Sequence, residues 1–318
     1  MLRYTIKRLL HCVVTVLIVV SIVSLLLSLM PTDYYFTEDQ LIKLTDEQKE
    51  SQLAAAGLLD SPFVQLFNFL KQLILKGDLG TSRRIQNGVP VVDVIGGKFA
   101  ISMKMGCIAL VISLFLGIPM GILQAKNKDS VFDHVGAAYT IFVNAVPRLI
   151  SYSLVLVLGV RLLKLPSMYS MRNVFVSSIL PIVCLSMGSI ASYALWMRRY
   201  MVDELTKDYI KLAQVKGLSM RTIMFKHVLR NAFVPMAQNL PTSFLLTIGG
   251  SLLVERFFSV PGLGPLLTDS ITRYDIPMVR GLVLLYASLG VIGLFLGDVL
   301  MTIFDPRIRL TGKGGDTR

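Results

Sequence analysis

The sequence predicts an all-α integral membrane protein with six transmembrane helices. Of its 318 residues, 53% are hydrophobic and only 16% are charged, a balance too apolar for an ordinary soluble domain. Six apolar runs are long enough to cross a hydrocarbon core of about 30 Å, which takes about 20 residues of helix. A backbone inside lipid must satisfy its own hydrogen bonds, so we expect these runs to be helices.

The six predicted spans lie near residues 9–30, 99–125, 135–160, 174–197, 232–254 and 279–304. The first begins like a secretory signal, but its apolar run exceeds the roughly 7–15 residues of such a signal and no small-x-small cleavage site follows. We therefore expect it to be retained as a span. The cysteines all fall inside predicted spans, which favours packing roles over a disulfide framework or a metal site: Cys12, Cys107 and Cys184.

The segment after the first span, residues 31–98, is the long water-facing piece expected on the outer side. Its stretch 37–59 favours helix, and residues 61–80 place five apolar side chains on one helical face: Phe63, Leu66, Phe67, Leu70 and Leu73. We expect an interfacial helix on the membrane or on the protein's own outer face. The predicted division is thus an N-terminal part, 1–98, and a core of five spans, 99–318.

The net charge of +12 is compatible with nucleic acid or with a membrane surface, so the positions of the charges decide. With the N-terminus inside, the inner pieces hold 17 Lys or Arg in 65 residues: 1–8, 126–134, 198–231 and 305–318. The outer pieces hold 12 in 105. This positive-inside bias predicts that both termini are cytoplasmic. Six spans and this charge distribution predict a membrane protein and no nucleic-acid partner.

The inner segment 198–231 carries eight basic residues and predicts a helix, a hinge and a second helix. Its first half repeats apolar residues with helical spacing: Met201, Leu205, Tyr209 and Leu212. Gly217 should end that helix in the left-handed conformation, and Ser219 should cap a second helix over 220–233. Such a pair could lie on anionic lipid, pack beneath its own bundle, or dock into a groove of a soluble partner.

This segment resembles the characteristic cytoplasmic loop of ATP-binding-cassette importer permeases, in the form found in dipeptide, oligopeptide and nickel permeases of the first-permease type. "DYIKLAQVKGLS" at 208–219 matches the subfamily pattern except at Val215, where alanine is usual, and "HVLRNAFVP" at 227–235 matches its second half. Four further stretches resemble the family in the same order: "KGDLGTS" (76–82), "GIPMGILQA" (117–125), "VERFFSVPGLGPLL" (254–267) and "FDPRIR" (304–309).

The resemblance implies a type I importer permease fold whose short coupling helix sits in a cleft of a cytoplasmic ATPase subunit. The residues it implies for that contact are Asp208, Tyr209, Ile210, Lys211, Leu212, Ala213, Lys216, Gly217 and Leu218. The implied partners are a homologous second permease subunit, two ATPase subunits, an extracytoplasmic binding protein and the lipid of a bacterial cytoplasmic membrane. The implied cargo is a dipeptide or oligopeptide, with a nickel chelate or an oligosaccharide as the alternative.

The sequence contains no motif that predicts catalysis. It has no G-x-x-x-x-G-K-[ST] phosphate loop, no G-x-S-x-G, no H-E-x-x-H and no paired Cys and His spacing. We therefore expect a transport subunit without a cofactor, with ATP bound by partner subunits. A secondary transporter is the alternative class, but it would usually show more intramembrane charge or an inverted pair of broken helices.

Two charged residues lie at membrane depth, where ionisable groups are functional candidates. Arg148 follows Pro147 in the third span, where the resembling family usually has serine, and Asp298 lies in the sixth. Either each charge is shielded by snorkelling or internal pairing, or Arg148 faces the pathway and contacts a peptide carboxylate.

Pro119, Pro147 and Pro181 should bend their helices. Six glycines should permit close helix approach: Gly117, Gly121, Gly249, Gly250, Gly293 and Gly297.

Overall fold

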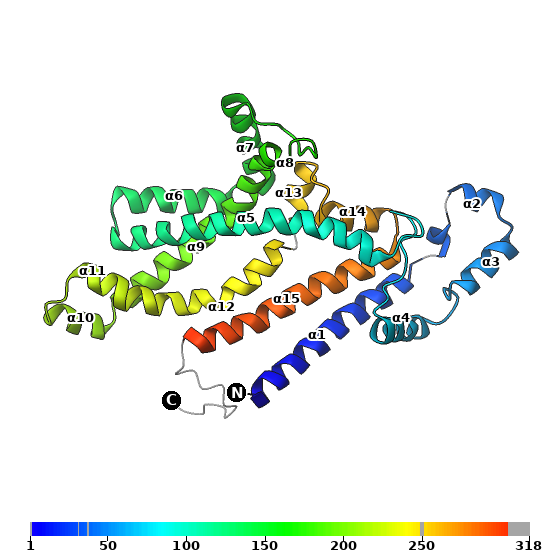
Figure 1. Ribbon diagram of the computed structural model, residues 1–318, viewed down its shortest axis with the longest axis horizontal. Coiled ribbons are helices and arrows are strands. Elements are labelled where there is room, and N and C mark those ends of the chain that lie inside the picture. Colours follow the sequence, from blue (N-terminus) through cyan, green and yellow to red (C-terminus); the bar gives the residue numbers. More distant parts are fainter. Residues whose placement is uncertain (1, 31, 37, 249–250, 305–318) are drawn as a thin grey trace.

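The computed structural model describes residues 2–30, 32–36, 38–248 and 251–304, and these residues are predominantly helical (Figure 1). Within these ranges no β-strand occurs, and a single antiparallel bridge joins Thr81 to Pro90. The tail motif beyond Phe304 lies outside the described residues, as do Gly249 and Gly250. The all-α class predicted from the sequence is therefore confirmed for the described part of the chain.

Four helical stretches are long and apolar enough to cross a membrane, and they match predicted spans one, two, four and six. They are Ile6–Ser28 within α1 (Leu2–Ser28), α5 (Val91–Lys126), Val174–Leu205 formed by α8 (Val174–Ser177) with α9 (Ile179–Leu205), and Ile276–Leu300 within α15 (Ile276–Phe304). Span two begins earlier than predicted, at Val91, and span four ends later than predicted, at Leu205. Pro119 lies inside α5, which stays one helix through it, and Pro181 falls in the first turn of α9, where proline is tolerated.

The third predicted span is not one continuous helix, and the bend expected at Pro147 is a complete break between two helices. The chain bends by 116° between α6 (Val131–Ala145) and α7 (Arg148–Leu163). Pro147 precedes α7, and Val146 before it is extended, as a residue before proline prefers to be. In Figure 1, α6 runs alongside α5 whereas α7 points away from both. The proline therefore does more than bend the helix, because it ends α6.

The fifth predicted span has a different start from the one expected. α11 (Met220–Thr222) and a π-helical turn, η2 (Ile223–Val228), lead directly into α12 (Leu229–Ile248). The second helix of the basic loop and α12 therefore form one helical unit, which begins before residue 232, the start predicted for the fifth span.

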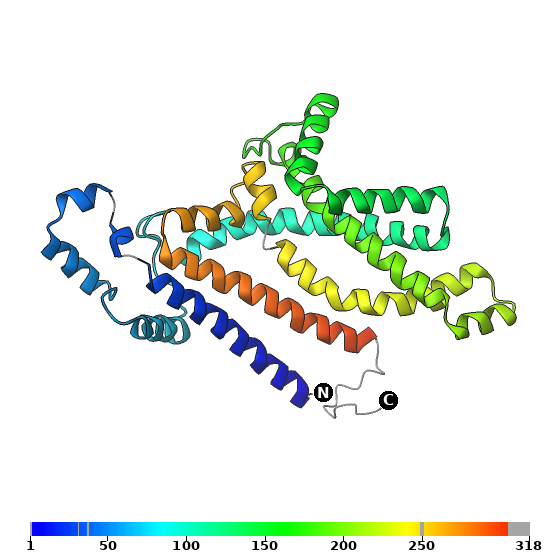
Figure 2. The same cartoon turned by 180° about the vertical axis from the view of Figure 1, so that it is seen from behind.

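The outer segment is helical, as its sequence predicts. It contains η1 (Thr32–Tyr35), α2 (Glu38–Lys43), α3 (Asp46–Ala55) and α4 (Pro62–Lys76). Thr45 begins α3 with a capping box that includes Gln48. On the apolar face predicted for α4, Phe63 and Phe67 are exposed, whereas Phe69, outside that face, is 7% exposed. Figure 2 shows the segment at one end of the long bundle.

Glycines set the distance between the two central helices, α5 and α9. A Cβ atom on Gly117 would lie 2.8 Å from the Ile190 carbonyl oxygen, and one on Gly121 would lie 2.5 Å from that of Ala194. Both distances are too short, so only glycine allows these backbones to approach. Gly293 of α15 similarly lies against α12, since its Cβ would be 2.7 Å from Thr242 Cα. The close packing predicted for these three glycines is confirmed.

Two ion pairs fasten neighbouring helices. Asp133 of α6 accepts bidentate hydrogen bonds from Arg198 of α9, at 2.6 Å from Nε and 2.7 Å from the terminal nitrogen. Asp298 of α15 pairs with Arg8 of α1 at 2.5 Å. For Asp298, internal pairing is therefore the alternative that the structure confirms.

Asp275, which is fully buried, ties the outer segment to the start of α15. Its Oδ2 accepts hydrogen bonds from Ser82 Oγ at 2.6 Å and from the backbone N–H groups of residues 83–85 at 3.0 to 3.1 Å. Its Oδ1 accepts from the Met278 N–H at 3.4 Å. One carboxylate thus satisfies four donors of a turn that lies about 190 residues earlier in the chain.

Replacing Asp275 with alanine should release this turn. Four donors lose their acceptor, and each unsatisfied buried group costs about 1–3 kcal/mol. Trypsin should then cleave the purified full-length protein after Arg83 or Arg84 roughly tenfold faster, the factor that about 1.4 kcal/mol produces.

The matched control is Asp269→Ala. Asp269 forms a more exposed pair with Arg256 at 2.5 Å, and loss of such a surface pair changes stability little. Its cleavage rate should equal that of the unmodified protein. An unchanged rate in Asp275→Ala as well would show that the carboxylate does not anchor the turn.

Candidate functional site

The basic loop forms a compact helical hairpin at the end of the bundle opposite the outer segment (Figure 1). α9 ends at Leu205, and α10 (Asp208–Val215) starts after a short break. The predicted apolar stripe is therefore wrong, because its members belong to two helices. Within α10 the buried residues are instead Ile210, at 0% exposure, and Ala213. They pack into a core cluster that includes Met201 and Val228.

Gly217 closes α10 in the way that the sequence predicts. Its φ is +77°, in the left-handed region, where a side chain is strained. The Leu218 N–H donates to the Ala213 carbonyl at 3.2 Å, and the Gly217 N–H donates to that of Gln214 at 2.9 Å. This pair of bonds is a Schellman motif. The predicted cap is also found, since Ser219 Oγ accepts from the Thr222 N–H at 3.3 Å.

A polar cluster fixes α10 to the helices on both sides of it. The Tyr209 hydroxyl donates to Glu204 Oε1, at the end of α9, at 2.5 Å. Asn231 of α12 donates from Nδ2 to both groups, at 2.9 Å to the hydroxyl and 3.1 Å to the carboxylate. Burial, together with the hydrogen bond to Glu204, raises the pKa of Tyr209 to about 12. The hydroxyl therefore keeps its proton at neutral pH and remains the donor.

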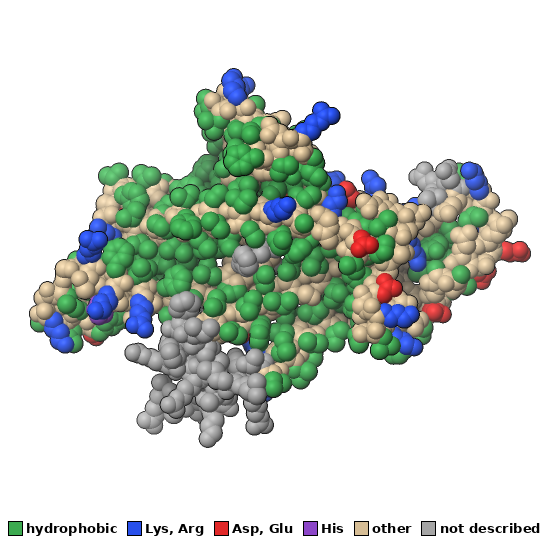
Figure 3. All heavy atoms as spheres, viewed as in Figure 1, with side chains coloured by type: hydrophobic (Ala, Val, Ile, Leu, Met, Phe, Trp, Pro, Cys, Tyr) green, Lys and Arg blue, Asp and Glu red, His purple; other side chains and the backbone are tan. Residues whose placement is uncertain are grey.

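The outer surface of the hairpin is apolar with a basic border. Val215 is 85% exposed and Leu212 is 54% exposed, and three neighbours are exposed as well: Leu218, Met220 and Phe225. Five exposed basic residues surround them: Lys207, Lys211, Lys216, Arg221 and Lys226. Figure 3 shows basic side chains at this end of the molecule. An apolar patch with a polar rim is typical of an interaction surface.

The nine residues implied for an ATPase contact divide into two groups. Seven are exposed on the hairpin: Asp208, Tyr209, Lys211, Leu212, Lys216, Gly217 and Leu218. Ile210 and Ala213 are buried and hold α10 against the bundle. The exposed set includes an ion pair between Lys211 Nζ and Asp208 Oδ1 at 2.8 Å. The seven exposed residues therefore form the solvent-facing surface of the hairpin, whereas the two buried residues anchor α10 to the bundle.

Pro147 and Arg148 lie elsewhere, at the break between α6 and α7. Arg148 is exposed in the first turn of α7 and lines a cavity of about 500 Å³. Most other polar groups of this cavity are hydroxyls and amides: Asn144, Ser151, Tyr152, Ser189, Ser192, Tyr193, Ser243, Thr247 and Ser251. Ser151 Oγ is buried without a hydrogen-bond partner. Among the described residues Arg148 forms no ion pair, so its charge is available to a ligand.

The stretch 254–267 includes parts of α13 (Leu252–Phe257) and α14 (Leu263–Thr272) and the tight turn that joins them. Glu255, at 3% exposure, accepts a hydrogen bond from the Gly264 N–H at 2.8 Å. Ser102 Oγ of α5 accepts one from the Leu263 N–H at 2.9 Å. These bonds hold the turn against the second span. The two acceptors, Glu255 and Ser102, were not predicted from the sequence.

Sequence reasoning missed the side chains that organise these sites. Asp275 could have been found, because an Asp before Ile and Pro at the start of an apolar run is a helix-start signal. Glu204 and Asn231 gave no comparable signal, since their contact depends on a chain reversal over 27 residues.

Metal ligation finds no support in the described part of the chain, where no group of three or more His, Cys, Asp or Glu side chains is arranged to hold an ion. The three cysteines are free, and Cys184 is buried.

Comparison with known proteins identifies the family. Residues 117–310 match the family described as binding-protein-dependent transport system inner membrane component. A dipeptide transport system permease protein of Lactococcus lactis subsp. cremoris is 32% identical over 98% of this chain and 100% of its own length. The corresponding Bacillus subtilis protein is 30% identical over 99% and 100%. An oligopeptide transport system permease protein of Haemophilus influenzae is 30% identical over 97% and 100%.

These matches cover nearly the whole chain, and the family match includes the hairpin, α12 and the described part of α15. The described helices add four to five spans of sufficient length and apolar character. The chain is a multi-pass membrane protein that belongs to the family of binding-protein-dependent transport system inner membrane components.

Proposed function

We propose that this chain is the permease subunit of an ATP-binding-cassette importer that carries peptides. The relatives that align over nearly its full length are named dipeptide and oligopeptide transport system permease proteins. The structural observation that carries the proposal is the exposed apolar face of α10, held rigidly at one end of an apolar bundle. A partner that supplies energy needs such a firm attachment point.

Six spans follow if the bent pair of α6 and α7 crosses once and α12 crosses as the fifth span. The α6–α7 pair is apolar enough to count as one broken span, and α12 has 20 residues. An even number of spans brings both termini to one side, and the positive-inside bias makes that side the cytoplasm of a bacterial cell. The hairpin with α10 then faces the cytoplasm too.

The coupling function assigned to α10 follows from its attachments. A soluble ATPase subunit would contact the exposed side chains of Leu212, Val215 and Leu218. Displacement of α10 would move the end of α9 through Glu204 and the start of α12 through Asn231. ATP hydrolysis takes place in two such partner subunits, and a homologous second permease and an extracytoplasmic binding protein complete the assembly.

The cavity at the α6–α7 break is the proposed place of substrate contact. Arg148, which has no ion-pair partner among the described residues, presents its cation at the N-terminal, electropositive end of α7. A free peptide carries a carboxylate at its C-terminus, so this arrangement suits that end of the cargo. The surrounding hydroxyl groups would accept or donate hydrogen bonds to the peptide backbone without selecting a sequence.

Charged substitutions on the hairpin face test the function directly. Leu212→Glu and Val215→Glu should abolish both co-purification of the ATPase subunits and ATP-dependent uptake of a labelled dipeptide, because a carboxylate would be buried in an apolar contact. Val131→Glu is the matched control, since Val131 is also a highly exposed apolar residue but lies outside the hairpin. Uptake by vesicles that hold this chain without any ATPase would instead indicate a secondary transporter.

The conformation of Gly217 gives a second test. In Gly217→Val, a β-branched residue is forced to φ +77°, which costs on the order of 1–2 kcal/mol or more. We expect loss of uptake with normal membrane insertion. Gly217→Asn should retain most uptake, because asparagine tolerates this region. Equal activity of the two variants, measured at equal membrane levels, would exclude a role for the left-handed turn.

Arg148 gives a third test that depends on the cargo. Arg148→Ala should reduce uptake of a free dipeptide roughly tenfold, the effect of losing about 1.4 kcal/mol of a charge-assisted contact. Uptake of the same dipeptide with an amidated C-terminus should be equally slow in the variant and the unmodified protein. Unchanged uptake of the free dipeptide at normal membrane levels would remove Arg148 from the pathway.

A further inference from the structure

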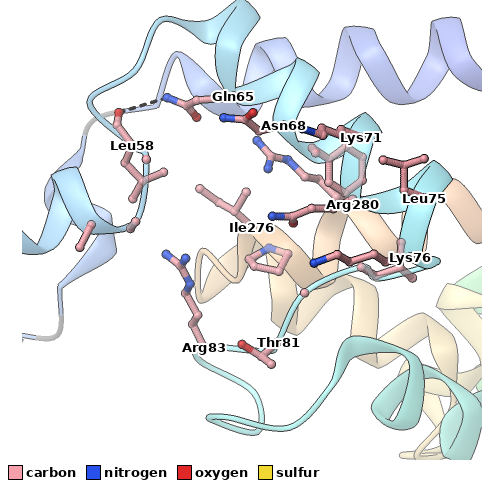
Figure 4. A pocket seen from close by; sticks show the side chains of 18 residues that line it. Leu58, Gln65, Asn68, Lys71, Leu75, Lys76, Thr81, Arg83, Ile276 and Arg280 are labelled. Atoms are coloured by element: carbon pink, nitrogen blue, oxygen red, sulfur yellow. Dashed lines mark hydrogen bonds between the residues drawn. The ribbon is translucent and has the colours of Figure 1, made fainter.

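A separate cavity lies at the outer end of the bundle, where α4 and the turn after it meet the start of α15. Its volume is about 670 Å³. Four cationic side chains line it, from three different parts of the chain: Lys71, Lys76, Arg83 and Arg280. None of the described residues that line it is acidic. Figure 4 shows that Arg83, Lys76 and Arg280 reach into the same space.

Aromatic rings, rather than carboxylates, hold the two arginines in place. The Arg280 guanidinium carbon lies 5.2 Å from the ring centre of Phe69, and that of Arg83 lies 4.6 Å from the ring centre of Tyr35. Such contacts orient a guanidinium but leave its charge unneutralised. Arg280 Nε is buried without a hydrogen-bond partner. Within the described chain neither arginine forms an ion pair, so no described carboxylate neutralises these two charges.

The cavity lies at the level where the apolar spans end. α1 ends at Ser28 and α15 begins at Ile276, and both residues line a smaller cavity that shares Arg83 and Arg280 with the large one. Span ends mark the boundary between hydrocarbon and head groups. The cationic groups are therefore at the depth of the lipid phosphates.

The exposed apolar face of α4 also indicates that the cavity lies at the depth of the lipid head groups. Phe63, Phe67 and Ile74 are exposed and share one helical face by their spacing of four and seven residues. Gln72 and Lys76, on the opposite side, line the cavity. A helix with an apolar face towards lipid and a polar face towards protein lies in the membrane interface. The cavity therefore lies between this interfacial helix, the turn after it and the start of α15.

We propose that this cavity binds the phosphate-bearing head group of an anionic membrane phospholipid. Guanidinium groups match phosphate oxygens in geometry and charge, which assigns the phosphodiester to Arg83 and Arg280. Lys71 and Lys76 add charge that favours an anionic lipid over a zwitterionic one. Leu75, Leu79 and Ile276 at the same cavity offer apolar contact to an acyl chain. This site is independent of the cargo and of the ATPase contact.

The consequence for the protein is attachment of the outer segment. A phosphate between Arg83 and Arg280 would neutralise two like charges and join the turn after α4 to α15. Lipid binding should therefore raise the midpoint of thermal unfolding as well as occupy the cavity.

The experiment uses the full-length protein in a neutral detergent. Three probes are titrated: dioctanoyl phosphatidylglycerol, dioctanoyl phosphatidylcholine and inorganic phosphate. Native mass spectrometry counts bound lipid, and thermal unfolding gives an independent measure. We expect saturable binding of phosphatidylglycerol, weaker binding of phosphatidylcholine and negligible binding of phosphate. Arg83→Gln and Arg280→Gln should each weaken phosphatidylglycerol binding roughly fivefold.

Two further variants keep the test decisive. Arg273→Gln makes the same change at an exposed arginine that lines neither cavity, and it should bind phosphatidylglycerol like the unmodified protein. Arg280→Lys keeps the charge and should restore part of the affinity if Arg280→Gln is poorly folded. Equal phosphatidylglycerol affinity in Arg83→Gln, Arg280→Gln and Arg273→Gln would overturn the proposal. Inorganic phosphate binding as tightly as the lipid would also overturn it, in favour of a soluble anion.

Discussion

The close contact between α5 and α9 is the constraint on which the rest of the bundle depends. Helices in lipid gain little from the hydrophobic effect, so tight backbone packing and hydrogen bonds hold them together. Gly117 and Gly121 allow this packing, because a Cβ atom at either position would collide with the α9 backbone. Once α9 is fixed, its Arg198 holds α6 and its Glu204 holds α10. The hairpin is thus joined to a rigid pair.

Buried carboxylates organise the opposite, outer end. Asp275 and Glu255 each accept backbone N–H groups from turns that would otherwise bring unpaired donors close to lipid. Neither carboxylate forms an ion pair in the described chain. Asp275 joins segments about 190 residues apart, whereas Glu255 closes the local turn between α13 and α14. The outer turns are therefore as firmly placed as the helices, which allows the cationic cavity beside α4 to keep its shape.

The sequence predicted much of this architecture, and the errors have physical causes. Spans one, two, four and six were found because long apolar runs are unambiguous, and Gly217 was interpreted correctly because glycine is the residue that most often closes a helix in the left-handed conformation. In the third predicted span only a bend at Pro147 was expected, because average hydropathy does not distinguish a bent helix from two helices joined by a sharp break. The apolar stripe of the basic loop failed because the break before α10 contains no glycine or proline. A local pattern marks Asp275 as a helix start, but its contacts with the turn at 82–85, like those of Asn231 with Glu204, join distant positions that local patterns do not reveal.

The central claim is that α10 receives a soluble subunit on the cytoplasmic side. Val215→Cys, in a variant whose native cysteines are replaced by serine, provides a label at the most exposed residue of that surface. A membrane-impermeant maleimide should label it in inside-out vesicles, not in right-side-out vesicles, and added ATPase subunits should block the reaction. Labelling from the outer side, or labelling that the ATPase leaves unchanged, would contradict the account.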